Sequence, residues 1–212
     1  MSNIQLTEDE IANNRREFLH IVDSKIKRDG ISKFVNEWLD GTSDFFKAPA
    51  STKYHGNYKG GLCEHSLNVY HRFEKNYDNE KKELKEKFNV ELNDESRAII
   101  SLFHDICKAN YYKLDLRNYK NEETGKWEKK EYYAIDEKFP FGHGEKSVFL
   151  LNQYIHLDYM EAICINWHMG GFDRRVLGGD NSLSLAFEKY PLAVLFHISD
   201  MEATYFDEKV NK

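Results

Sequence analysis

The chain has 212 residues, a formal net charge of −6 and 41% hydrophobic residues, with 14 Phe and 13 Tyr. This length and composition suffice for one domain with a sizeable core and exclude a disordered chain. The acidic balance argues against long nucleic acid as a partner, because proteins that bind it usually carry a basic excess. No apolar run reaches the roughly 18 residues that a membrane span needs.

The cysteines and the N-terminal sequence bear on the compartment. Cys63, Cys107 and Cys164 are odd in number and lie in apolar surroundings, as buried thiols in a reducing compartment do. Residues 1–6, Met-Ser-Asn-Ile-Gln-Leu, lead into charged residues and show no signal-peptide pattern. We therefore expect a soluble, cytoplasmic protein with no membrane partner, while the oligomeric state stays open.

The first 40 residues predict two helices. Residues 7–10 read Thr-Glu-Asp-Glu, the pattern of a capping box at a helix start. The apolar residues that then share one helical face are Ile11, Phe18, Val22 and Ile26. A second, shorter helix is expected around Phe34 and Trp38, ending at Gly41. Residues 41–60, which include Pro49 and two glycines, predict a loop.

The middle of the chain predicts two helices and one hairpin. Apolar spacing from Leu62 to Tyr77 predicts the third helix, and the charged residues 75–91 continue it or form an exposed segment. A helix that opens at Asp94 is expected to carry the pair His104-Asp105. In residues 110–140, aromatic and β-branched residues flank a polar turn, which predicts a β-hairpin.

The C-terminal part predicts further helices. They are expected from Gly144, after Asp158 and from Pro191, with a loop in the glycine-containing residues 170–179. The predicted fold class is thus all-α, a helical bundle with a small β-hairpin insertion. We expect a single domain over 1–212, with N-terminal helices at 1–40, a core at 54–205 and the insertion at 110–140.

The pair His104-Asp105 lies in the apolar run 99–108, where polar side chains are costly unless they find partners. An imidazole beside a carboxylate suits a divalent metal. Similar ligand-type residues beside apolar helical patterns are His65, His143, His168 and Asp200. Any one such histidine is most often a hydrogen-bonded core residue. Their joint occurrence in five segments indicates a hydrolytic metal centre.

This order, H…HD…H…H…D from about Tyr54 to Tyr205, resembles the HD-domain superfamily of metal-dependent phosphohydrolases. It is most similar to HD domains of the 3′–5′ exoribonuclease and nucleotide-hydrolase kind. Those share a Gly-Gly-Leu-x-x-His segment, here residues 60–65, and an earlier histidine, matched by His55. Such exonucleases also carry an OB-type module that this chain lacks, which argues against polymeric RNA as the substrate.

The resemblance implies two divalent metals, the first held by His65, His104, Asp105 and Asp200 and the second by Asp105, His143 and His168. Mn, Fe, Co, Ni and Mg all remain candidates, and the histidines favour a transition metal. The resemblance also implies a phosphohydrolase that cleaves a nucleotide or another small phosphate mono- or diester with a metal-activated hydroxide. Since histidines ligate when neutral, we expect activity to fall below about pH 6.5.

Four residues are candidates for contact with this phosphorylated substrate. Lys108 lies three residues after Asp105, and in the family a lysine there often meets phosphate, so Lys108 is a second candidate catalytic residue beside Asp105. It could equally be a surface lysine. Arg174 and Arg175 could reach a phosphate from a flexible loop or simply be solvated. His55 is the fourth candidate.

Glu64 and Glu145 flank ligand histidines, so they either orient the imidazoles or occupy first turns of helices. The ligand set is also compatible with a diiron oxygenase, since some members of the superfamily use a similar set for that chemistry. A third possible function is a non-catalytic module that binds metal or nucleotide, because a fold does not decide a function.

Overall fold

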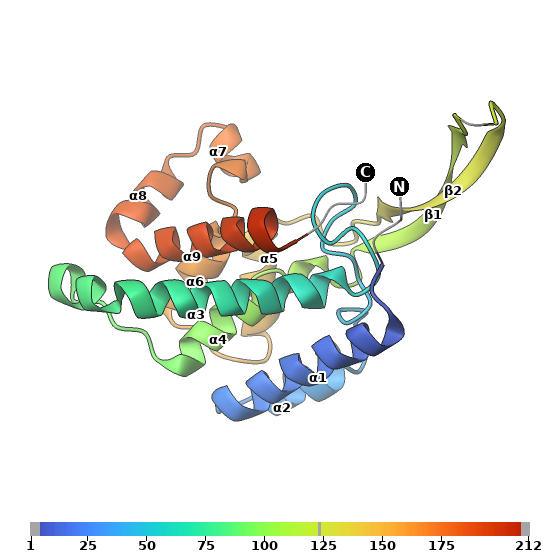
Figure 1. Ribbon diagram of the computed structural model, residues 1–212. Coiled ribbons are helices and arrows are strands. Elements are labelled where there is room, and N and C mark those ends of the chain that lie inside the picture. The colour runs from blue at the N-terminus through green and yellow to red at the C-terminus, as the bar shows by residue number, and fades with distance from the viewer. Residues whose placement is uncertain (1–4, 123, 209–212) are drawn as a thin grey trace.

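The structure is a computed structural model that describes residues 5–122 and 124–208. It is mostly helical with one two-stranded antiparallel sheet, which confirms the expected helical protein with a small hairpin (Figure 1). The elements are α1 (Glu8–Lys25), α2 (Ile31–Lys33), α3 (Gly61–Phe88), α4 (Asp94–Phe103), β1 (Tyr112–Lys120), β2 (Trp127–Ile135), α5 (His143–Asn152), α6 (Tyr159–Trp167), α7 (Arg174–Leu177), α8 (Ser182–Lys189) and α9 (Pro191–Glu202).

The long helix α3 crosses the middle of the molecule (Figure 1). It packs against α9, α4 and α1, and α6 packs against α4, α5 and α9. A buried aromatic group joins the N-terminal helices to this body, since the rings of Phe18 and Phe34 lie 5.9 and 5.2 Å from that of Phe103. Phe103 directly precedes His104, so the aromatic core fixes the point at which the pair enters the interior.

Several helices begin and end where the sequence predicts, and others do not. The capping box is present at α1, where Thr7 and Glu10 bond reciprocally. The charged residues 75–91 continue α3 up to Phe88, so this segment is mostly helix. A π-helical segment, Phe34–Leu39, follows α2 and takes the place of the second predicted helix. The expected loop 170–179 contains α7 and a 3-10 turn at Gly170–Phe172, and α8 is an addition.

The hairpin projects away from the helices (Figure 1). Its strands pair in register from Tyr112 opposite Ile135 to Lys120 opposite Trp127. A two-stranded hairpin is marginally stable alone, so its base matters. There the Asp136 amide donates to the Tyr111 carbonyl at 2.9 Å, and the Tyr112 hydroxyl lies 3.5 Å from the Ala50 carbonyl. The hairpin is therefore attached through Tyr111 and Tyr112, a few residues after His104-Asp105.

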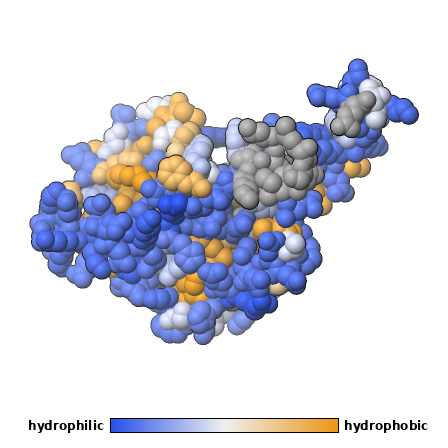
Figure 2. Space-filling model, viewed as in Figure 1, coloured by the Kyte–Doolittle hydropathy of each residue, from blue (hydrophilic) through white to orange (hydrophobic). Residues whose placement is uncertain are grey.

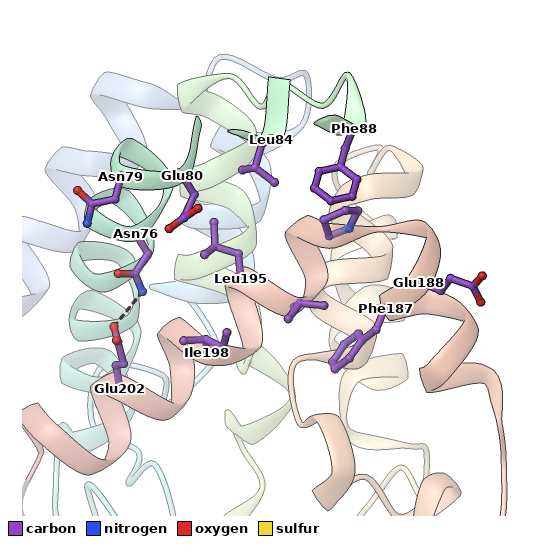
Figure 3. Close-up of a pocket in the computed structure, with 12 residues that line it drawn as sticks. Asn76, Asn79, Glu80, Leu84, Phe88, Phe187, Glu188, Leu195, Ile198 and Glu202 are labelled. Atoms are coloured by element: carbon purple, nitrogen blue, oxygen red, sulfur yellow. Dashed lines mark hydrogen bonds between the residues drawn. The ribbon is translucent and has the colours of Figure 1, made fainter. Parts of the chain in front are cut away.

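Hydrophobic residues gather on the surface over α7, α8 and α9, whereas α3 presents mostly hydrophilic residues (Figure 2). A groove between α3, α8 and α9 is lined by apolar side chains such as Leu84, Phe187 and Ile198 (Figure 3). On the wall of this groove, Asn76 of α3 donates to Glu202 of α9 at 2.8 Å (Figure 3). Asn76 also donates to the Ser199 hydroxyl at 3.0 Å. These bonds fix the end of α9, the helix that carries Asp200.

Among the residues described, no helix combines the length and the apolar character that crossing a membrane requires.

Candidate metal centre

The six residues singled out as ligands meet in the interior of the helical body. Together with Cys107, they form overlapping groups in which one ligand atom of each residue lies within 4.8 Å of those of the others: His65, His104 and Asp200; His104, Asp105 and His168; and Asp105, Cys107 and His143. Five segments deliver them, namely α3, the residues after α4, the start of α5, the end of α6, and α9. The structure thus brings together every proposed ligand, and metal binding itself stays a prediction.

Asp105 lies at the centre of the cluster and is almost fully buried. Its Oδ1 is 2.9 Å from His143 Nε2 and 3.4 Å from His168 Nε2. Its Oδ2 is 3.5 Å from Nε2 of both His65 and His104. The two oxygens therefore face two different pairs of imidazoles.

His104 and His168 occupy equivalent positions, because each is the residue that ends a helix, α4 and α6 respectively. Nδ1 of His104 lies 2.8 Å from the Ser101 carbonyl, and Nδ1 of His168 lies 2.7 Å from the Ile165 carbonyl. Carbonyls in the last turn of a helix lack an intrahelical donor, and these two accept from the imidazoles instead. Since a carbonyl only accepts, each Nδ1 carries a proton, and in the neutral ring each Nε2 points a lone pair into the cluster.

This geometry corrects the expectation that the α4 helix carries the pair. The helix ends at Phe103, and Asp105 has φ −109° and ψ 16°, outside the helical region. His104 caps the helix through its own ring, so the chain turns immediately afterwards and directs Asp105 into the cluster. Apolar periodicity continues through this turn, which is why the sequence pattern places the helix end too late.

Charge and burial set the protonation of the cluster. Burial alone would raise the pKa of Asp105, but Lys108 and the surrounding imidazoles hold it well below its usual range. Loss of water lowers the pKa of His104 and of His143. Burial also acts to lower the pKa of His65, yet Glu208 and the aspartates raise it well above its ordinary value. The cluster therefore holds ionised aspartates beside two kinds of imidazole. Those of His104 and His143 have lowered pKa values and favour the neutral form, whereas that of His65 has a raised pKa and favours the protonated form.

Unpaired atoms indicate that the donor set suits a cation. Of the buried side-chain atoms that lack a hydrogen-bond partner in residues 5–122 and 124–208, three belong to this region: His168 Nε2, His55 Nε2 and Glu208 Oε2. Leaving such an atom unpaired costs about 1–3 kcal/mol. In addition, His65 Nε2 and His104 Nε2 lie only 3.2 Å apart. Because the pKa of His65 is raised, its Nε2 shares a proton with His104 Nε2 there, and a divalent cation that displaced this proton would bind both nitrogens.

Two members of the region carry no sequence signal of function. Cys107 Sγ lies 3.4 Å from His143 Nδ1, but burial raises the pKa of its thiol to about 12, which makes it a poor ligand in this state. Glu208 accepts from His65 Nδ1 at 2.8 Å, and its side chain is 1% exposed. A π-helical segment after α9, Ala203–Asp207, delivers Glu208 to the cluster. Sequence reasoning misses Glu208 because a charged residue after a helix is usually solvated.

Lys108 is buried, so its assignment as a surface lysine is wrong. Its Nζ lies 2.5 Å from Asp105 Oδ2. Burial favours the neutral amine, but the Asp105 carboxylate outweighs it and raises the pKa of Lys108 above its ordinary value. Lys108 is therefore an ammonium group at the centre of the cluster. His55, another candidate for substrate contact, lies with its ring centroid 4.7 Å from that of His65. Contact of either residue with a substrate phosphate stays a prediction.

Arg175 is bound within the protein and does not lie in a flexible loop. Its guanidinium donates to Asp173 at 2.7 Å, to Glu145 at 2.7 Å and to Asn166 at 3.2 Å, and lies 4.1 Å from the Trp167 ring centroid. It thus joins the segment before α7 to α5 and α6, and its hydrogen-bonding capacity is used there. Arg174 is exposed in α7, and its contact with substrate stays a prediction.

Glu64 and Glu145 prove to be residues of first helical turns with other partners. Glu64 accepts from the Tyr58 hydroxyl at 2.7 Å. Glu145 accepts from the Gly142 amide at 3.2 Å and also binds Arg175. These bonds favour a role in the first turns of α3 and α5 over the orientation of imidazoles. Glu208, by contrast, accepts from Nδ1 of His65, one of the proposed ligands.

Gly144 sets the distance between α5 and α6, and with it that between His143 and His168. A Cβ on Gly144 would lie 2.2 Å from the Asn166 carbonyl oxygen. We expect Gly144→Ala to force the helices apart, lower the free energy of unfolding by about 1–3 kcal/mol and weaken metal binding. Chemical denaturation in the presence of a chelator measures the change in the free energy of unfolding, and titration with metal measures the change in metal affinity. Gly171→Ala, where a Cβ meets open space, is the control; equal behaviour of the two variants would contradict this role of Gly144.

Comparison of the chain with models of protein families, with curated proteins and with solved structures found no match. The geometry of the cluster and the order of its residues are therefore what support a functional proposal.

Proposed function

We propose that the protein is a metal-dependent phosphohydrolase of the HD-domain type, which cleaves a nucleotide or another small phosphate mono- or diester. The observation that carries this proposal is the buried carboxylate of Asp105 surrounded by four imidazoles, which come from α3, α5 and the residues that follow α4 and α6. Together with Asp200 they occur in the order H…HD…H…H…D. No basic excess is present in the sequence, which favours a small substrate over a long nucleic acid.

The two faces of Asp105 support a dinuclear centre. His143 and His168 lie at Oδ1, whereas His65 and His104 lie at Oδ2, and Asp200 Oδ1 is 3.3 Å from His65 Nε2. Asp105 would contribute one oxygen to each of two cations, the first held also by His65, His104 and Asp200 and the second by His143 and His168. When bound, the cations would supply Lewis acidity toward a phosphoryl oxygen and lower the pKa of a water.

The protein's own residues would orient the ligands, admit the substrate and stabilise the developing charge. Capping bonds to Ser101 and Ile165 fix the rings of His104 and His168, which keeps the ligand geometry preformed. Water and substrate would approach past His143 and Asp200, whose side chains are 30% and 12% exposed, since the other ligands are buried. Lys108 would turn from Asp105 to a phosphoryl oxygen and offset the charge that develops there.

Elemental analysis of the purified protein, with turnover of bis-p-nitrophenyl phosphate and a nucleotide panel under Mn²⁺, tests the proposal. We expect about two metals per chain and hydrolysis of at least one phosphate ester. Two irons without turnover would favour a diiron oxygenase instead. Full metal loading without turnover of any ester would favour the non-catalytic binding module, and a chain that takes up no metal would overturn the proposal.

Replacement of Lys108 tests whether this residue stabilises charge on the phosphoryl group or only forms an ion pair with Asp105. We expect Lys108→Ala to retain the metals, because the amine is not a ligand, and to lower kcat by about 100-fold through loss of charge stabilisation. Steady-state kinetics on metal-loaded protein and elemental analysis measure the two quantities. Lys113→Ala, an exposed lysine of β1, serves as the control. Unchanged kinetics would leave Lys108 with only its ion pair to Asp105.

A further inference from the structure

The imidazole of His65 makes contacts through both of its ring nitrogens. Its Nε2 faces Asp105 and Asp200, whereas its Nδ1 is bound by Glu208 at 2.8 Å. The ring of His55 lies against that of His65 at a centroid distance of 4.7 Å. One ligand atom from each of His55, His65 and Glu208 lies within 4.8 Å of the other two. This group extends the cluster past the six residues that the proposed function uses.

Two of these side chains carry buried atoms without a partner, Nε2 of His55 and Oε2 of Glu208. Glu208 is 1% exposed and uses its other oxygen for His65, so its free oxygen belongs to a buried carboxylate. The side-chain amide of Asn68, which is uncharged, also donates to Glu208 Oε1, at 3.4 Å. A buried carboxylate oxygen and a buried imidazole nitrogen are both costly when left unpaired, and a ligand atom of Glu208 lies within 4.8 Å of one of His55.

We propose that His55 and Glu208 hold a third divalent cation, beside the centre around Asp105. Imidazole and carboxylate together favour a transition metal such as Mn²⁺, Fe²⁺ or Zn²⁺. Glu208 serves this cation through Oε2 and orients His65 through Oε1, so the additional position is coupled to the first metal. This inference rests on the proposed function, since both use His65.

The third cation is expected to bind more weakly than the other two. Two side chains hold it, with water or an anionic group of the substrate in the remaining positions, and the neighbouring cations repel it. Filling should therefore proceed in order as the metal concentration rises, with the His55–Glu208 position last. This ordering distinguishes a third cation from a pair of side chains that only orient His65.

Crystals of the full chain soaked at increasing MnCl₂ concentrations, with anomalous scattering recorded at each step, test the proposal. We expect a peak between His55 and Glu208 at the higher concentrations, after the peaks at Asp105. His55→Gln should abolish that peak and leave the others, because His55 makes no hydrogen bond to the six ligands through its free nitrogen. Equilibrium dialysis with Mn²⁺ should show the same loss of one equivalent in solution.

His71→Gln is the matched control, since His71 lies on the exposed side of α3 and pairs with Glu17. It should leave all metal positions filled. A filled Asp105 centre with only water at His55, or a third peak that persists in His55→Gln, would overturn this inference and leave the proposed function standing. An empty Asp105 centre would overturn both.

Discussion

Asp105→Asn is expected to lose both metals of the centre. Asparagine keeps the size of the side chain, but one carboxylate oxygen becomes an amide nitrogen, which cannot ligate and which would face imidazole nitrogens or the Lys108 ammonium. Residues that only orient ligands already contribute 10–100-fold to metal affinity, so loss of the shared carboxylate should weaken binding by more than about 100-fold. Elemental analysis after reloading and dialysis measures this.

The control for this variant is Asp158→Asn. Asp158 caps α6, the helix that ends at His168, and asparagine caps helices equally well. This variant should retain both metals and full activity. Circular dichroism of both proteins separates lost metal from lost fold. Two metals retained in a folded Asp105→Asn protein would contradict the central place of Asp105 and the dinuclear assignment.

The convergence of the six ligand-type residues was predictable because each is a polar side chain in an apolar helical setting, where burial demands partners. What the sequence does not contain is the direction of each ring. That direction comes from helix ends: His104 and His168 each bond the carbonyl three residues earlier, and this depends on where α4 and α6 stop. Periodicity locates a helix well and its last residue poorly.

Lys108 and Glu208 illustrate two other limits. Charged residues are rarely buried, so the sequence leaves Lys108 equally compatible with a surface position and gives no reason to single out Glu208. Lys108 is buried because Asp105 is within 2.5 Å, and Glu208 because a π-helical turn carries it to His65. Arg175 shows the reverse case: glycines around it suggest mobility, but Asp173, Glu145 and Trp167 hold it in place. Lys108 and Asp105 are only three residues apart, but the pairings of Glu208 with His65 and of Arg175 with Glu145 join residues far apart in the chain, which local patterns do not encode.

Metal uptake should depend steeply on pH, with two protons released per chain as the centre fills. Against the opposing effect of burial, Asp105 raises the pKa of His168, and Glu208 does so for His65. These two rings therefore carry an extra proton below their raised pKa values, and a metal must displace it. The pKa values of His104 and His143 are lowered, and those of Asp105 and Asp200 are lowered too, so these groups contribute no protons near neutrality.

Because protons compete with the metal for these two rings, the affinity for metal rises with pH until the raised pKa values of His65 and His168 are passed, and then levels off. Two displaced protons correspond to an increase of about 100-fold in apparent affinity per pH unit at pH values below both raised pKa values, so the rise continues past the ordinary histidine pKa of about 6.5. Calorimetric titration of Mn²⁺ in two buffers of different ionisation enthalpy counts the protons directly. Four protons would mean that all the histidines are charged before binding. Release of no protons would mean that His65 and His168 are already neutral before the metal binds, which would contradict the raised pKa values on which this prediction rests.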